Sequence, residues 1–195
     1  MKTMRFYPVF LLAVFALVSC KKDDNDEPVP SAFTTITASN VQVDPGTPID
    51  EVWLRAFSIG SGYEPIAKVP FQNNGFSITL PTDVADKYMV PANDWWIPEV
   101  DPSIKIAAYI ELSAVYQGNV IGSFSLRDAS FDTTVSYMFA TAPFTVTGSF
   151  LEYGYVYHMN LKAGWNQYAI TNWGGNPEDY TSTIPSGLTG RFSHL

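Results

Sequence analysis

The sequence predicts an all-β protein, an antiparallel β-sandwich of about ten short strands. From Phe33 onward apolar residues recur with a period of two, and no run of ten or more residues repeats with the helical period. Groups of Gly, Pro, Asn and Asp interrupt this alternation about every eight to twelve residues, the turn spacing of a sandwich. We therefore expect a single sandwich domain over residues 33–195, within a chain of 195 residues.

The N-terminus predicts a signal peptide over residues 1–19. Lys2 and Arg5 precede an apolar stretch, residues 6–18. This stretch contains Pro8 and is shorter than the roughly 20 residues that a membrane-spanning helix needs. A cleaved leader is therefore expected rather than a permanent transmembrane helix.

Cys20 is the expected lipidation site. Residues 17–20, Leu-Val-Ser-Cys, resemble the lipobox of bacterial lipoproteins, in which the cysteine is acylated and becomes the new N-terminus. Ser19 is small enough to let a peptidase reach the bond before Cys20, and two or more acyl chains such as palmitate anchor a protein stably. The alternative is an inert, buried thiol.

Residues 20–32 predict a disordered tether, because they are acidic, contain two prolines and hold almost no apolar surface to bury. The acidic run after Cys20 also resembles the export signal of Bacteroidota lipoproteins. That resemblance implies a lipid anchor in the outer membrane with the domain exposed at the cell surface. The alternative is a linker that is merely solvated, which leaves the leaflet open.

The first half of the domain predicts four strands, over residues 34–43, 52–59, 66–71 and 76–80. Asn73, Asn74 and Gly75 favour the positive backbone angles of a tight hairpin turn between the third and the fourth. We expect the second, third and fourth strands to form an antiparallel meander.

Residues 81–102 break the alternation with four prolines and two adjacent tryptophans, which predicts a long loop or a short helical turn followed by a loop. The alternation then resumes, and the whole set suggests an immunoglobulin- or transthyretin-like sandwich. The remaining strands are expected over residues 104–116, 120–126, 135–139, 144–150, 153–161, 166–171 and 188–192.

Catalytic and metal motifs are not found in the sequence. His158 and His194 are far apart, and the acidic residues that could pair, Asp94, Glu99 with Asp101, and Glu178 with Asp179, lie in polar segments typical of solvated surface. Basic residues are isolated apart from Lys21 and Lys22, and the net charge of -8 disfavours nucleic acid. We expect a protein that is not an enzyme and that needs no metal or cofactor.

Aromatic residues outside the strand pattern are the candidate ligand contacts. Flat indole rings stack on sugar C–H faces, while Asn and Asp bond hydroxyl groups. The alternative is that one of the adjacent tryptophans closes an end of the sandwich. The candidates are Asn93, Asp94, Trp95 and Trp96 in the long loop, and Trp173 and Tyr180 around a second Gly-, Asn- and Pro-rich segment.

Two further segments, GFSITLP at residues 75–81 and LKAGWNQY at residues 161–168, resemble stretches of small Bacteroidota outer-membrane lipoproteins of unknown function. In the second segment we expect residues 162–164 to turn the chain, Trp165 to cover the core and Asn166 to bond the turn. The resemblance implies a surface lipoprotein with a β-sandwich and supplies no catalytic residues.

The function expected first is therefore non-enzymatic, a lipid-anchored envelope protein that binds or assembles with an extracellular partner. The alternative is a carbohydrate-binding accessory lipoprotein of a glycan-uptake system that uses the Trp95 and Trp96 loop. A fimbria-like assembly unit comes third, and a hydrolase comes last.

Overall fold

A computed structural model describes residues 33–94, 100–130, 132–150, 152, 154–172 and 174–195. The predicted all-β, sandwich-type fold is confirmed. The described strands form a twelve-stranded sheet and a two-stranded sheet, and two short 3₁₀ turns are the helical elements of the same residues. The strands are β1 (Thr35–Ala38), β2 (Glu51–Ser58), β3 (Gly62–Pro70), β4 (Phe76–Thr79), β5 (Val90–Pro91), β6 (Lys105–Ala107), β7 (Ile110–Tyr116), β8 (Asn119–Arg127), β9 (Thr133–Ala140), β10 (Phe144–Phe150), β11 (Tyr155–Leu161), β12 (Gly164–Thr171), β13 (Glu178–Thr181) and β14 (Thr189–His194), and the turns are η1 (Asp86–Tyr88) and η2 (Ala92–Asp94).

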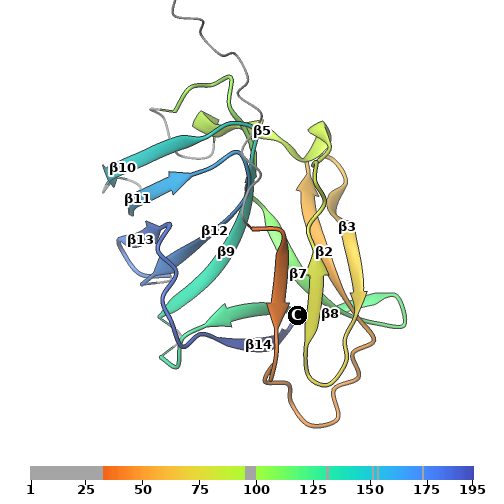
Figure 1. Cartoon of the computed structure of the whole chain (residues 1–195). Coiled ribbons are helices and arrows are strands. Elements are labelled where there is room, and N and C mark those ends of the chain that lie inside the picture. The colour runs from red at the N-terminus through yellow and green to blue at the C-terminus, as the bar shows by residue number, and fades with distance from the viewer. Residues whose placement is uncertain (1–32, 95–99, 131, 151, 153, 173) are drawn as a thin grey trace, which may run out of the picture.

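The large sheet is strongly curved, and the strands at its two edges lie on opposite sides of the domain (Figure 1). Its order is β10-β11-β13-β12-β9-β8-β7-β2-β3, with β14 paired to β8, and with β6 paired to both β5 and β9. In Figure 1, β10 and β11 lie on one side, β2 and β3 on the other, and β1 between them. Its neighbouring strands are antiparallel except β11 and β13, which run parallel.

Strand β9 separates two hydrophobic cores, because successive side chains of a strand point to opposite faces. Tyr137 and Phe139 enter the larger core, which β1 and β4 cover. Met138 and Ala140 enter the smaller core, which strands β10 to β13 enclose together with Ala92 and neighbouring residues. A strand buried on both faces carries apolar residues at consecutive positions, as β9 does.

The predicted meander is wrong at its fourth strand. The hairpin turn itself is confirmed, since Asn73 and Asn74 both have positive φ and Gln72 bridges Gly75. After this turn, however, β4 leaves β3 and pairs with β1 in the small sheet. Burial explains the departure: Phe76 and Ile78 are buried in the larger core, which they reach only by lying over the face of the large sheet.

The strand predicted over residues 104–116 is broken into β6 and β7. Ile106 of β6 pairs with β5 and β9, whereas β7 pairs with β2 and β8. Between them the Ile110 amide donates to the Ala108 carbonyl at 3.1 Å, which turns the chain sharply at Tyr109. The alternation runs on through this corner, so the sequence pattern concealed it.

Strand β13 was not predicted, because only Tyr180 of its four residues is buried. It inserts between β11 and β12, which follow each other in the chain. The break over residues 81–102 was predicted correctly for its described part, which holds the two 3₁₀ turns and the two-residue strand β5.

The turn of the LKAGWNQY segment forms as predicted. The Asn166 amide donates to the carbonyl oxygens of Lys162 at 2.8 Å and Gly164 at 2.9 Å, and its oxygen accepts from the Lys162 amide. Trp165 is buried, and its indole N–H donates to the Pro81 carbonyl at 2.7 Å. Residues 75–81 and residues 161–168 are therefore bonded to each other across the fold.

Candidate functional site

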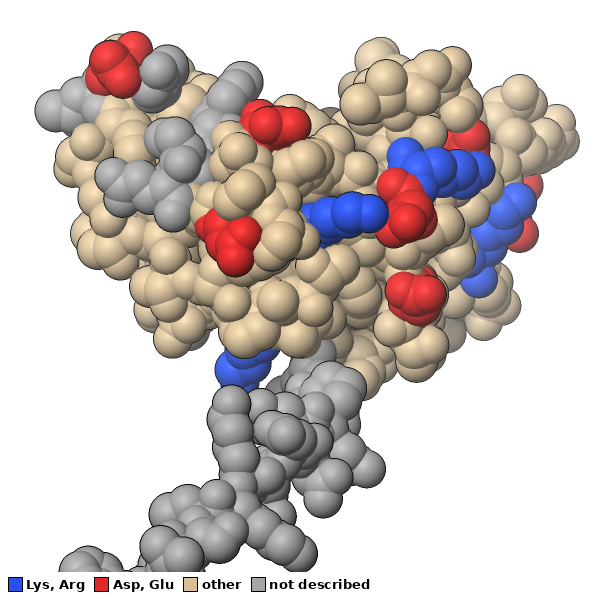
Figure 2. Space-filling model, turned by 90° about the horizontal axis from the view of Figure 1, so that it is seen from above, with Lys and Arg blue, Asp and Glu red and all other residues tan. Residues whose placement is uncertain are grey.

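A groove with a volume of about 570 Å³ opens between the end of β2, the start of β3 and the segment from η1 to η2. These elements lie at the upper end of the molecule in Figure 1, and Figure 2 views that end from above, where the surface is hollowed between two lobes. We call this site the aromatic groove. It is lined by Phe57, Ile59, Tyr63, Lys87, Tyr88, Val90, Asp94 and Tyr109.

Three aromatic rings dominate the groove, those of Phe57, Tyr63 and Tyr109. The Phe57 ring centroid lies 5.4 Å from that of Tyr63 and 5.9 Å from that of Tyr109, and both contacts are edge-to-face. Aromatic pairs favour this geometry because the positive edge of one ring meets the negative face of the other. The three rings hold one another in place while remaining 36–46% exposed.

The backbone explains why these rings face outward. In β2, Ala56 and Ser58 point inward, so Phe57 between them points to the outer face. Tyr63 is its cross-strand partner on β3. Tyr109 occupies the corner between β6 and β7, where its carbonyl accepts a hydrogen bond from the Phe57 amide at 3.0 Å.

Two pairs of oppositely charged side chains lie beside the rings. Lys87 donates to the Glu64 carboxylate, which also accepts from the Tyr88 hydroxyl at 2.9 Å. Hydrogen bonds from Lys87, then Ser61 and Tyr88, lower the pKa of Glu64 to about 2, and the same pairing raises the pKa of Lys87. Behind the rings a second pair joins Arg55 to Glu111 at 3.5 Å, with the Arg55 guanidinium 5.2 Å from the Tyr63 ring centroid.

A second aromatic group, the tyrosine cluster, lies in the smaller core and consists of Tyr155, Tyr157, Tyr168 and Tyr180. The Tyr180 ring contacts the other three at centroid distances of 5.0–6.2 Å, and its hydroxyl donates to Glu178 at 2.7 Å. Burial raises the pKa of all four phenols, and the nearby Tyr109 adds to this rise at Tyr155 and Tyr168. Tyr109 thus lines the aromatic groove and also lies near enough to the tyrosine cluster to affect two of its phenols.

The predicted ligand residues are placed as follows. Asp94 is exposed and lines the aromatic groove. Asn93 is half-buried, and its side-chain oxygen is buried with no hydrogen-bond partner among the described residues. Tyr180 is buried in the tyrosine cluster, so its ring packs in the core and is not presented at the surface. Cys20, Trp95, Trp96 and Trp173 lie outside the described residues.

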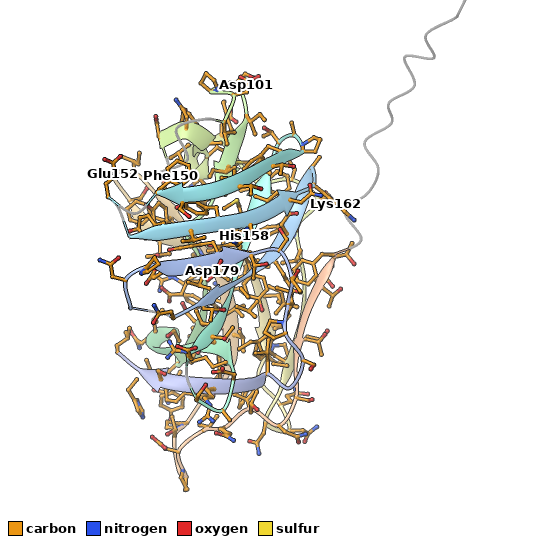
Figure 3. All side chains as sticks on the ribbon, turned by 90° about the vertical axis from the view of Figure 1, so that its left-hand side faces the viewer. Asp101, Phe150, Glu152, His158, Lys162 and Asp179 are labelled. Carbon is orange, nitrogen blue, oxygen red and sulfur yellow. The ribbon has the colours of Figure 1, made fainter. Side chains whose placement is uncertain are left out.

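The other acidic candidates are held apart or engaged locally. Glu178 and Asp179 are consecutive on β13 and point to opposite faces, so they cannot act together on one bond. Asp101 is exposed on a loop, where the amide of Ser103 donates to it and is the largest cause of its lowered pKa. Figure 3 shows Asp101 beyond β10, well away from Asp179, which lies on β13. Glu99 lies outside the described residues.

The two histidines are likewise separate. His158 is exposed on β11 (Figure 3), and His194 near the C-terminus lies 3.8 Å from Asp44. Within the described part of the chain, no three His, Cys, Asp or Glu side chains are grouped as a metal site would require. None of the helical segments described is long and apolar enough to span a bilayer.

Sequence reasoning missed the three rings of the aromatic groove. Phe57 carried a usable signal, because it is a large apolar residue at an outward position of the β2 alternation. Tyr63 and Tyr109 carried none that could be recognised, since their proximity depends on strand pairing and on the corner after β6.

Compared with protein-family models, with curated proteins and with solved structures, the chain gives no match.

Proposed function

We propose that this chain is a lipid-anchored lipoprotein of the outer membrane, whose β-sandwich is exposed at the cell surface and works as a non-enzymatic binding module. The anchor is supported by the N-terminal pattern of Lys2, Arg5, the apolar stretch and the lipobox ending at Cys20. The binding role rests on one structural observation, the aromatic groove.

The aromatic groove supports a binding role because three large aromatic side chains remain partly exposed to solvent at one concave place. Large apolar side chains gathered at one concave place on a surface mark sites of interaction, whereas single exposed ones do not. A volume of about 570 Å³ also falls within the range of about 300–1,000 Å³ that small-molecule sites occupy. An extracellular ligand or a side chain of another envelope protein would cover these rings.

The acylation of Cys20 and the exposure of the domain at the cell surface are tested together in the native host. With labelled palmitate, the wild-type chain should take up label and fractionate with the outer membrane, and Cys20→Ser should lose both properties. Protease added to intact cells should degrade the wild-type domain. An intact leader, or an unacylated Cys20 in the mass spectrum of the native protein, would contradict the proposal.

A second candidate function is carbohydrate binding through the Trp95 and Trp96 loop, as an accessory to glycan uptake. One observation favours it: Asp94, which directly precedes Trp95, lines the aromatic groove. A glycan array of the protein tests this candidate, compared with Trp95→Ala and Trp96→Ala. A blank array together with a lower melting temperature of both variants would identify the tryptophans as structural.

A further inference from the structure

We propose that the aromatic groove itself is a binding site for uncharged carbohydrate, with sugar rings stacked on Tyr63 and Tyr109. This inference rests on the proposed binding function and names its ligand class and its contact residues. The predicted tryptophans are not part of it, because every side chain invoked belongs to β2, β3, the corner before β7 or the η1–η2 segment.

The ring geometry favours a flat, amphipathic ligand. Tyr63 and Tyr109 each meet Phe57 edge-to-face, at interplanar angles of 68° and 67°, so the three rings form an angled platform rather than a closed slot. Phe57, Tyr63 and Tyr109 are 38%, 36% and 46% exposed. A pyranose has a face of C–H groups that covers such a ring and a rim of hydroxyl groups that stays hydrated.

The polar groups of the aromatic groove suit hydroxyl partners. Tyr63 and Tyr109 each carry a phenol, which both donates and accepts hydrogen bonds, and the Asp94 carboxylate accepts them. A purely aliphatic ligand would leave these groups without partners and would itself remain partly in water, because the groove is open and its three rings belong to side chains that are 36–46% exposed. This argues against a lipid chain as the occupant.

The charges argue for an uncharged ligand. Both cations beside the rings already have carboxylate partners, Lys87 with Glu64 and Arg55 with Glu111. No described cation lies within ion-pair distance of Asp94, so an anionic ligand would meet a carboxylate without a compensating cation. A chain with a net charge of -8 repels anions further.

Cationic ligands are disfavoured for a different reason. Two aromatic faces around the aromatic groove already carry the protein's own cations: Arg55 lies 5.2 Å from the Tyr63 centroid, and Lys87 lies 4.8 Å from the Tyr88 centroid. A ligand ammonium group would have to displace them to gain the same cation–π contact.

The test uses the full-length chain in a polyoxyethylene detergent, which contains no sugar. Calorimetric titrations with neutral hexasaccharides of glucose, mannose and xylose are compared with hexagalacturonate, an acidic hexasaccharide. We expect at least one neutral hexasaccharide to bind and hexagalacturonate not to bind. Tyr109→Ala and Tyr63→Ala should each raise the Kd by about tenfold, the loss expected for one aromatic stacking contact.

Tyr116→Ala is the matched control, since Tyr116 lies at the opposite end of β7 from Tyr109. It should leave the Kd unchanged, and circular dichroism should show all three variants folded. If Tyr109→Ala fails to fold, Tyr63→Ala carries the comparison alone.

Three results would overturn the inference: no binding of any neutral hexasaccharide at millimolar concentration, an equal Kd for Tyr63→Ala, Tyr109→Ala and Tyr116→Ala, or binding lost only in Trp95→Ala and Trp96→Ala. Each leaves the proposed lipid-anchored envelope protein intact, because Cys20 acylation and surface display are measured separately. Loss of acylation with sugar binding retained would instead overturn the anchor and keep this site.

Discussion

The Phe57 amide donates a hydrogen bond to the Tyr109 carbonyl at 3.0 Å, and the rings of the same two residues meet edge-to-face. Phe57 is the last outward-facing residue of β2, and Tyr109 forms the corner between β6 and β7. Backbone pairing thus fixes where these rings stand and leaves a large part of each in solvent.

The Tyr109 ring is expected to contribute little to folding. Tyr109→Ala should lower the free energy of unfolding by about 1 kcal/mol or less, because nearly half of the side chain is already exposed. Tyr157→Ala should lower it by about 3–5 kcal/mol, since Tyr157 is 2% exposed in the smaller core. Urea denaturation of both variants measures the difference, and comparable losses would show that Tyr109 is a core residue.

The hydrogen bond from the Trp165 indole to the Pro81 carbonyl should stabilise the fold by joining residues 161–168 to residues 75–81. Trp165→Phe keeps a buried ring but leaves the Pro81 carbonyl without its donor, so we expect a loss of about 1–3 kcal/mol. For a domain of this size each kcal/mol lowers Tm by roughly 2–4 °C. Trp53→Phe is the control, because the indole of Trp53 is only half-buried and donates to Glu51. Calorimetry giving the same Tm for both variants would argue against the link.

Gly122 of β8 allows the C-terminal strand β14 to approach closely, because it has no side chain. A Cβ atom at this position would lie 2.3 Å from the Ser193 carbonyl oxygen and 2.4 Å from the Phe192 ring. Gly122→Ala should therefore push β14 away and cost about 1–3 kcal/mol. Ser123→Ala, at the next position of the same strand, is the control. Hydrogen exchange should show the amides of β14 losing protection only in Gly122→Ala, and unchanged protection would contradict the close approach.

The Glu64 carboxylate should make stability depend on pH in the acid range. Its pKa in the folded protein is about 2, below the ordinary value of 4.5, so the folded state binds fewer protons than the unfolded state. The stabilising contribution is therefore complete above pH 4.5 and is lost as the pH falls toward 2. NMR titration of the side-chain carboxyl should place its midpoint near 2.

Glu64→Gln should flatten the acid part of the stability curve, with Glu152→Gln, at an exposed glutamate, as the matched control. A Glu64 titration midpoint close to 4.5 would show that the pair with Lys87 does not form in solution.

Local patterns predicted most of the strands and two of the turns. The double asparagine turn before β4 and the turn around Asn166 each depend on residues only a few positions apart, and both formed as expected. The errors were of another kind. Neither the pairing of β4 with β1 nor the insertion of β13 between β11 and β12 follows from a pattern within a strand, because pairing depends on which faces must be buried.

The sequence by itself determined the all-β class and the turns, since alternation and turn residues are properties of neighbouring residues, and the lipid anchor at Cys20 stays a prediction. Only the tertiary structure decided the candidate site. Phe57, Tyr63 and Tyr109 come from a strand face, its cross-strand partner and a corner more than 40 residues further along the chain. Strand pairing across that distance brings the three rings together, because the backbone N–H and C=O groups of one strand find their hydrogen-bond partners only on another strand.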